Sequence, residues 1–239
     1  MGEVILVASG KGGTGKTVIT ANMGAVLAQR GYKVVLIDMD LGFRNLDLCL
    51  GLESKVVYDV CDVLTGLCRI KQALIRDKRF NHLYLMAAAP KKEDADLTPL
   101  HMKVLCKKLK KRFDYILIDA PSGIGEGLGL AAAGADRAWI ITVPEYTALR
   151  DADILDRYLI QAGITDRMVV LNKVKTELIT TGFIPGIKEI ARRLRPELAG
   201  VIQYDDNIHI AANNGLPIVY KTGTYIEENF NKIADRLLL

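Results

Sequence analysis

The feature that most constrains this 239-residue chain is the segment Gly10–Thr17, GKGGTGKT, which directly follows the apolar run Val4–Ala8. Its frame matches G-x-x-x-x-G-K-[ST], in which glycines let backbone N–H groups surround phosphate oxygens. A helix beginning near Lys16 would point its positive end at the same anion. The segment therefore predicts a phosphate-binding loop between a strand and a helix, in a protein that binds a nucleoside triphosphate.

Each residue type in the loop has an expected part. Lys16 should reach the terminal phosphates, and the Thr17 hydroxyl should complete the coordination of Mg²⁺. Lys11 is a second lysine within the loop, and its side chain can point along the phosphates or away toward a neighbour or solvent. We expect the nucleotide to contact the whole loop, namely Gly10, Lys11, Gly12, Gly13, Thr14, Gly15, Lys16 and Thr17.

Apolar runs alternate with helical stretches along the rest of the chain. Near-continuous Val/Ile/Leu runs are typical of strands buried on both faces, and their alternation with helices indicates right-handed crossovers and an open parallel sheet. We expect strands at Val4–Ala8, Lys33–Asp38, His82–Met86, Tyr115–Asp119, Ala138–Val143 and Arg167–Asn172, with shorter ones at Gly200–Gln203 and Pro217–Val219. Helices are expected at Lys16–Arg30, Thr98–Lys111, Tyr146–Gln161, Phe183–Leu194 and Tyr225–Leu238.

The predicted fold class is α/β, a three-layer P-loop NTPase fold. Its mostly parallel central sheet should have about seven or eight strands, with helices on both faces. Half of the residues are hydrophobic and a quarter are charged, which is ordinary for a domain with a buried parallel sheet. No repeat, linker or break in composition divides the chain, so we expect a single domain over residues 1–239.

Polar side chains lie at the carboxyl ends of three of the predicted strands, the edge at which open α/β sheets bind ligands. Asp119 ends four apolar residues in a Walker B pattern, suited to the Mg²⁺ shell. Asp38 and Asp40 could bind Mg²⁺ or orient the attacking water, although the same spacing also fits a simple polar strand exit. Asn172 could present a donor and an acceptor to a purine, or could merely begin a loop.

The loop, with its extra lysine, resembles the deviant Walker A motif of the MinD/ParA class of P-loop ATPases. The resemblance implies ATP or ADP and Mg²⁺ as ligands, with Lys11 reaching across a dimer interface to the partner's nucleotide. It further implies that Asp40 positions the attacking water and that Asn172 reads adenine. The implied catalytic residues are Lys11, Lys16, Asp40 and Asp119, and the implied metal-site residues are Thr17, Asp38 and Asp119. Two departures are Ser122, where alanine is usual, and Ile202–Asp205, which lacks the usual Ile-Pro pair.

Further stretches resemble the MinD branch of this class, the septum-site ATPases of bacterial division. They are Leu41–Leu48, Gly51–Glu53, Val57–Val60, Gln72–Asp77 and Pro144–Asp153. This resemblance implies an ATP-dependent homodimer that recruits a MinC-like division inhibitor at the membrane and is released by a MinE-like or other regulator. It also implies that Arg150–Asp153 lies near the partner-binding face.

Other function classes are weaker alternatives. The net charge of +4 is too small to indicate nucleic acid, although the basic runs at 107–112 and 192–195 keep a ParA-type, DNA-bound role as the runner-up. No segment suggests the substrate pocket of a metabolic synthetase. An iron–sulfur relative would need cysteines at 120–138, where there are none, and Cys49, Cys61, Cys68 and Cys106 have no metal-ligand spacing.

The ends of the chain bear on its location. The first strand begins almost at once, and no apolar run approaches the roughly 18 residues that would span a bilayer, so we expect a cytoplasmic protein. Members of the MinD branch carry an amphipathic membrane helix beyond the core, and we expect this helix to be absent here. The stripe Ile226, Phe230, Ile233 and Leu237 should instead pack on the core. Peripheral attachment to the membrane in the ATP state is therefore expected only if an anchor is present.

Overall fold

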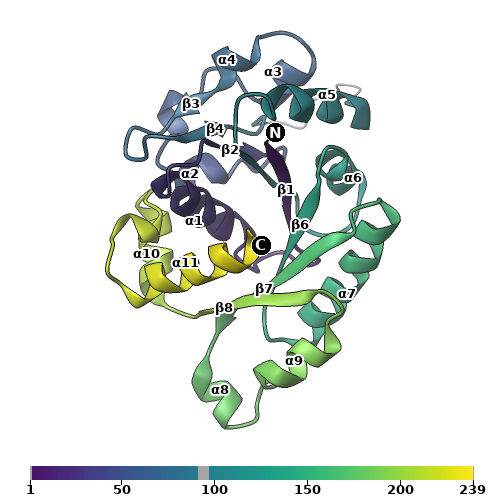
Figure 1. The fold of residues 1–239 in the computed structure, drawn as a ribbon, viewed down its shortest axis with the longest axis vertical. Coiled ribbons are helices and arrows are strands. Elements are labelled where there is room, and N and C mark those ends of the chain that lie inside the picture. The colour runs from purple at the N-terminus through teal and green to yellow at the C-terminus, as the bar shows by residue number, and fades with distance from the viewer. Residues whose placement is uncertain (1, 91–96, 239) are drawn as a thin grey trace.

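A computed structural model describes residues 2–90 and 97–238 of the chain; the outermost residues of the expected domain lie outside this part. Its centre is an eight-stranded sheet in the order β3-β4-β2-β5-β1-β6-β7-β8. The seven longer strands are parallel, and β3 joins β4 antiparallel at one edge (Figure 1). The strands are β1 Glu3–Ala8, β2 Val34–Asp38, β3 Ile75–Arg76, β4 Leu83–Met86, β5 Tyr115–Asp119, β6 Arg137–Thr142, β7 Asp166–Val174 and β8 Glu197–Gln203.

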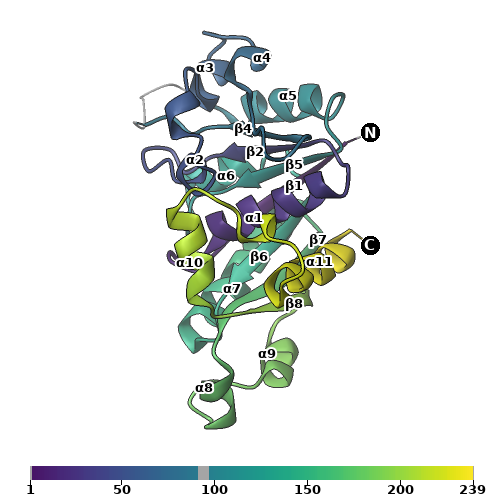
Figure 2. The same ribbon diagram turned by 90° about the vertical axis from the view of Figure 1, so that its left-hand side faces the viewer.

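Helices cover both faces of the sheet, which confirms the predicted three-layer α/β fold (Figures 1 and 2). The longer helices are α1 Lys16–Gln29, α5 Pro99–Leu109, α7 Tyr146–Gln161 and α11 Tyr225–Leu237. Shorter helices are α2 Leu46–Cys49, α3 Val60–Leu64, α4 Ile70–Ala73, α6 Glu126–Ala132, α8 Thr176–Thr180, α9 Ile187–Arg193 and α10 Asp206–Asn213, with 3-10 turns η1 Glu53–Lys55 and η2 Ile218–Tyr220.

The alternation of side chains along β1 separates two hydrophobic cores. Val4, Leu6 and Ala8 face one core, which also contains residues of α3, α5, α6 and α7. Ile5 and Val7 face the other, together with residues of α1 and α11. Because successive strand residues point to opposite faces, β1 is buried on both sides, as its unbroken apolar run predicted.

One expected strand is wrong, and one expected helix is shorter than predicted. Pro217–Val219 is not a strand but enters the turn η2, because side chains of α1 satisfy the backbone of Val219. Val219 N–H donates to Asn22 Oδ1 at 3.3 Å, and Gln29 Nε2 donates to the Val219 carbonyl at 3.2 Å. The helix expected at Phe183–Leu194 begins only at Ile187, after Pro185 and Gly186 interrupt the chain.

The last helix confirms the expected packing of its apolar stripe. Ile226, Phe230, Ile233 and Leu237 are all buried against the sheet and α1. None of the helices in residues 2–90 and 97–238 is long and apolar enough to cross a membrane.

Candidate functional site

The phosphate-binding loop lies where the sequence predicts it, between the end of β1 and the start of α1. Gly13 and Gly15 adopt φ values of +77° and +88°, the left-handed region that favours glycine. Gly10 is needed for a different reason, because the backbone of Asp151 in α7 occupies the space that a Cβ would take. The glycines thus determine the shape of the loop, and α7 packs against it at Gly10.

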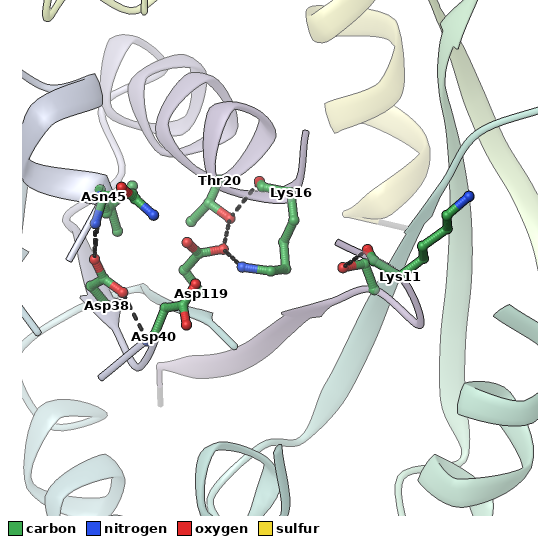
Figure 3. A network of polar contacts seen from close by, with 9 residues as sticks. Lys11, Lys16, Thr20, Asp38, Asp40, Asn45 and Asp119 are labelled. Carbon is green, nitrogen blue, oxygen red and sulfur yellow. Dashed lines mark hydrogen bonds and ion pairs between the residues drawn. The ribbon is translucent and has the colours of Figure 1, made fainter. Parts of the chain in front are cut away.

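A buried ion pair connects the loop to the central sheet. Lys16 Nζ donates to Asp119 Oδ1 at 2.8 Å, and Thr20 Oγ1 donates to the same oxygen at 3.1 Å (Figure 3). Thr20 was missed from the sequence, although it follows Lys16 by one helical turn and so lies on the same face of α1. Asp119 Oδ2 is buried and has no hydrogen-bond partner. This carboxylate therefore keeps one oxygen for a further ligand.

Asp38 lies beside Asp119, because the two residues pair in register at the ends of β2 and β5. Its oxygens accept the backbone N–H groups of Asp40 at 2.9 Å, Asn45 at 3.2 Å and Leu46 at 3.0 Å. Burial, followed by the nearby charge of Asp119, raises the pKa of the Asp38 carboxyl well above its ordinary value. A cation between these carboxylates would lower the cost of ionising both.

Asp40 occupies the next turn and lines the cleft. Burial raises the pKa of its carboxyl, while the charge of Lys16 opposes that shift. Its backbone N–H donates to Asp38 Oδ1, whereas its side chain forms no hydrogen bond among the described residues.

Lys11 points away from this cluster. Its ammonium donates to Glu145 Oε2 at 3.1 Å and to Thr147 Oγ1 at 3.4 Å, just before and within α7, and Figure 3 shows it on the far side of the loop from Lys16. The Lys11 side chain is 44% exposed. The structure thus selects the outward orientation that the sequence left open. Glu145 was missed as a partner, and nothing in the spacing of the two residues signals the contact.

Side chains at the end of β7, those of Asn172 and Lys173, hold the loop through its carbonyl groups. Its Nδ2 donates to the carbonyl of Thr14 at 2.8 Å, and the neighbouring Lys173 Nζ donates to the carbonyl of Gly13 at 2.8 Å. A small hollow beside it is lined by residues that include Val18, Tyr204 and His209. Asn172 therefore supports the loop and lines this hollow.

The loop opens into a cleft of about 700 Å³ between α1, α2 and α10. Its walls include Gly12–Val18, Asp40 and Asn45 on one side and His209 and Gly215 on the other. A volume of this size is within the ordinary range for a small-molecule site. Of the predicted site residues, Gly12–Thr17 and Asp40 line this cleft, and Asp119 reaches it through its contact with Lys16. Asp38 lies beside Asp119, Asn172 lines the separate small hollow, and Lys11 points away.

The donor set fits Mg²⁺ held jointly with a phosphate. Within the described part of the chain, no three His, Cys, Asp or Glu side chains form a metal site by themselves. Mg²⁺ is commonly held by only one or two carboxylates together with substrate phosphates and water. The unpartnered Asp119 Oδ2 matches that pattern, and Thr14 Oγ1 is a second buried oxygen without a partner, on the loop itself.

Known proteins share both the sequence and the fold. Residues 5–218 match the family described as the CobQ/CobB/MinD/ParA nucleotide binding domain. The septum site-determining protein MinD of Bacillus subtilis is 41% identical over 240 residues, covering 100% of this chain and 90% of that protein. The MinD of Thermotoga maritima is 40% identical over 239 residues, covering 99% and 88%.

Solved structures of MinD proteins have the same fold as this chain. The MinC:MinD cell division protein complex of Aquifex aeolicus contains a chain that superposes with a TM-score of 0.92 at 36% identity, covering 99% of this chain and 95% of that one. MinD of Pyrococcus horikoshii complexed with Mg-ADP gives 0.89 at 30% identity, covering 99% and 96%. Together with the loop and its two lysines, these likenesses place the chain in the MinD branch of the CobQ/CobB/MinD/ParA nucleotide-binding family.

Proposed function

We propose that this protein is an ATP-driven dimer switch that binds MgATP in the cleft, pairs with a second copy and hydrolyses the nucleotide. The observation that carries the proposal is the buried contact of Lys16 with Asp119 beneath the loop, which joins the phosphate-binding lysine to the Walker B carboxylate. The proposal is supported by family membership and by the Mg-ADP complex of a relative with the same fold.

The residues of the cleft then have separate parts. Lys16 leaves Asp119 for the phosphates, and the loop N–H groups bind the remaining phosphate oxygens. Thr17, Asp38 and Asp119 would hold Mg²⁺, which would neutralise negative charge on the phosphates. Asn172 keeps the loop in place and contacts the adenine.

Hydrolysis requires two further residues. Asp40 orients the attacking water, a positioning role suited to a carboxylate in phosphoryl transfer. Lys11 gives up Glu145 and crosses to the nucleotide of the partner copy, where its charge stabilises the transferring group. Because Lys11 is on the outer side of the loop, a neighbouring copy can receive it without refolding of the loop.

The nucleotide state would control partner binding. The Aquifex relative forms a complex with MinC, and we propose that the ATP-bound dimer recruits a MinC-like inhibitor to place the division site. A MinE-like or other regulator would reverse this by stimulating hydrolysis. The exposed part of α7 that includes Arg150 is the proposed partner face. We place the protein in the cytoplasm, peripheral on the membrane in the ATP state when an anchor is available.

Sedimentation velocity of the purified chain tests the proposal. With Mg²⁺ and ATP, the Asp40→Ala variant should sediment as a dimer, because it binds ATP without consuming it. With ADP it should sediment as a monomer. Lys16→Ala, which loses the phosphate contact, should remain a monomer in both. Identical sedimentation of Asp40→Ala with ATP and ADP would refute the switch. Salt-sensitive retention on non-specific DNA that requires ATP would favour the DNA-bound alternative.

A further inference from the structure

A second concave surface lies on the α3–α5 side of the protein, which Figure 1 shows at the end of the molecule away from α8 and α9. A groove of about 810 Å³ runs between α5 and the segment from α3 to α4. Its floor includes Leu64, Leu105 and Leu109, all buried in the core beneath. The groove shares no lining residue with the nucleotide cleft.

The rim of this groove is cationic. Arg69 and Lys71 lie on one wall, and Lys108, Lys111 and Arg112 lie on the other. In residues 2–90 and 97–238, none of these five side chains forms an ion pair, whereas Lys110 on the same helix pairs with Asp136 at 2.8 Å. Among the described residues that line the groove there is no carboxylate. Five like charges facing one apolar trough favour an anionic ligand, because such a ligand relieves their mutual repulsion.

The wall of the groove formed by α5 also carries exposed apolar residues. Leu100, Val104 and Lys108 follow one another at spacings of four, so they lie along one side of the helix. Leu100 is 65% and Val104 is 44% exposed. The 11 residues of α5 extend about 16 Å at 1.5 Å per residue. A ligand that covers this wall along its length must therefore be elongated and apolar on one side.

We propose that the groove binds an acidic amphipathic helix of a partner protein. An apolar face with leucine-like residues at i, i+3 and i+4 would fill the trough, and Asp or Glu residues beside it would meet the rim cations. A helix can lie along the groove between its two walls, whereas a flat membrane surface would contact mainly the rim. A ligand that covers the groove along α5 must extend from Leu100 to Lys108, which favours a helix over a compact small molecule. Because the groove is separate from the nucleotide cleft, this binding should not require ATP.

Fluorescence anisotropy with designed peptides tests the proposal. The probe is a labelled helical peptide of roughly 14 residues, about 21 Å long, with a leucine stripe flanked by glutamates. A second peptide has the same leucines and lysines for glutamates. The protein variants are the double change Lys108→Glu and Lys111→Glu in the groove and, as a matched control, Lys103→Glu and Lys107→Glu, two exposed residues of α5 outside it.

The full chain should bind the acidic peptide and bind the basic one at least about tenfold more weakly. The groove variant should bind the acidic peptide with about tenfold lower affinity than the wild type and should bind the basic peptide more tightly. The affinities of the control variant should be close to those of the wild type. Unchanged ATP-analogue binding shows that each variant is folded. Equal losses in both variants, or no preference for the acidic peptide, would overturn the proposal. Anionic phosphatidylglycerol vesicles that bind through Lys108 and Lys111, while the peptide does not bind, would instead assign the groove to lipid.

Discussion

Lys11 and Glu145 hold the phosphate-binding loop and the start of α7 together, with 3.1 Å between Nζ and Oε2. Both side chains are about half exposed, so this contact contributes little to stability, at most about 1 kcal/mol. The contact matters because it holds the Lys11 ammonium within its own subunit. If Lys11 is needed at a partner's nucleotide, its ammonium must leave Glu145 each time a dimer forms.

Neutralising Glu145 should therefore favour the dimer. With ATP, and with Asp40→Ala to prevent turnover, Glu145→Gln should tighten dimerisation by no more than about fivefold, since it removes a surface ion pair from the monomer alone. Sedimentation over a range of protein concentrations measures the change. Weaker dimers would show that Glu145 is itself needed across the interface.

The buried pair of Lys16 and Asp119 predicts a stability effect. Asp119→Asn should lower the free energy of unfolding by about 2 kcal/mol, because it leaves a buried ammonium without its carboxylate, partly offset by relief of the repulsion on Asp38. Adding Lys16→Met should restore most of the loss. Urea unfolding with EDTA and without nucleotide measures both. Losses that simply add would contradict the coupling of the two residues.

Asp40 should be needed for turnover and not for binding. Asp40→Ala keeps the backbone N–H that holds Asp38, so ATP affinity should stay within about twofold while the rate of phosphate release falls about a hundredfold. Glu53→Ala changes another carboxylate of the same cleft and should leave the rate nearly unchanged. Normal turnover in Asp40→Ala would show that another group orients the water.

Gly15 and Asn172 test the construction of the loop. Asn172→Ala removes the hydrogen bond to Thr14 and should weaken ADP and ATP binding by about tenfold. Gly15→Ala should weaken binding further, because φ is +88° there and a Cβ would collide with the Asn172 amide. Isothermal titration measures each affinity. Combining both changes should recover part of the Gly15→Ala loss, and no recovery would mean that backbone strain alone is responsible.

Much of the fold and of the cleft could be predicted because the signals are local. A glycine loop between an apolar run and a helix indicates one arrangement, and parallel strands deliver Asp38, Asp119 and Asn172 to the same edge of the sheet. The remaining features depend on contacts between distant segments. The contact of Lys11 with Glu145 joins residues 134 positions apart, and no local pattern encodes it.

Two elements that differ from the prediction also depend on contacts between distant segments. Ile75–Arg76 is too short to show alternation, and it becomes a strand because its residues pair with Leu85 and Tyr84 on β4. Pro217–Val219 has the composition of a strand but takes its hydrogen bonds from Asn22 and Gln29 on α1. In both places tertiary hydrogen bonds outweighed the local preference.

A mixing experiment tests the central claim, that Lys11 of one copy completes the site of the other, most directly. Lys11→Ala and Asp40→Ala are each expected to be inactive alone. A mixed dimer has one site with its own Asp40 and with Lys11 supplied by the partner, so an equimolar mixture that sediments as dimers with ATP should recover about a quarter of the wild-type ATPase rate. A mixture that forms dimers but remains as inactive as its parts would contradict action of Lys11 across the interface.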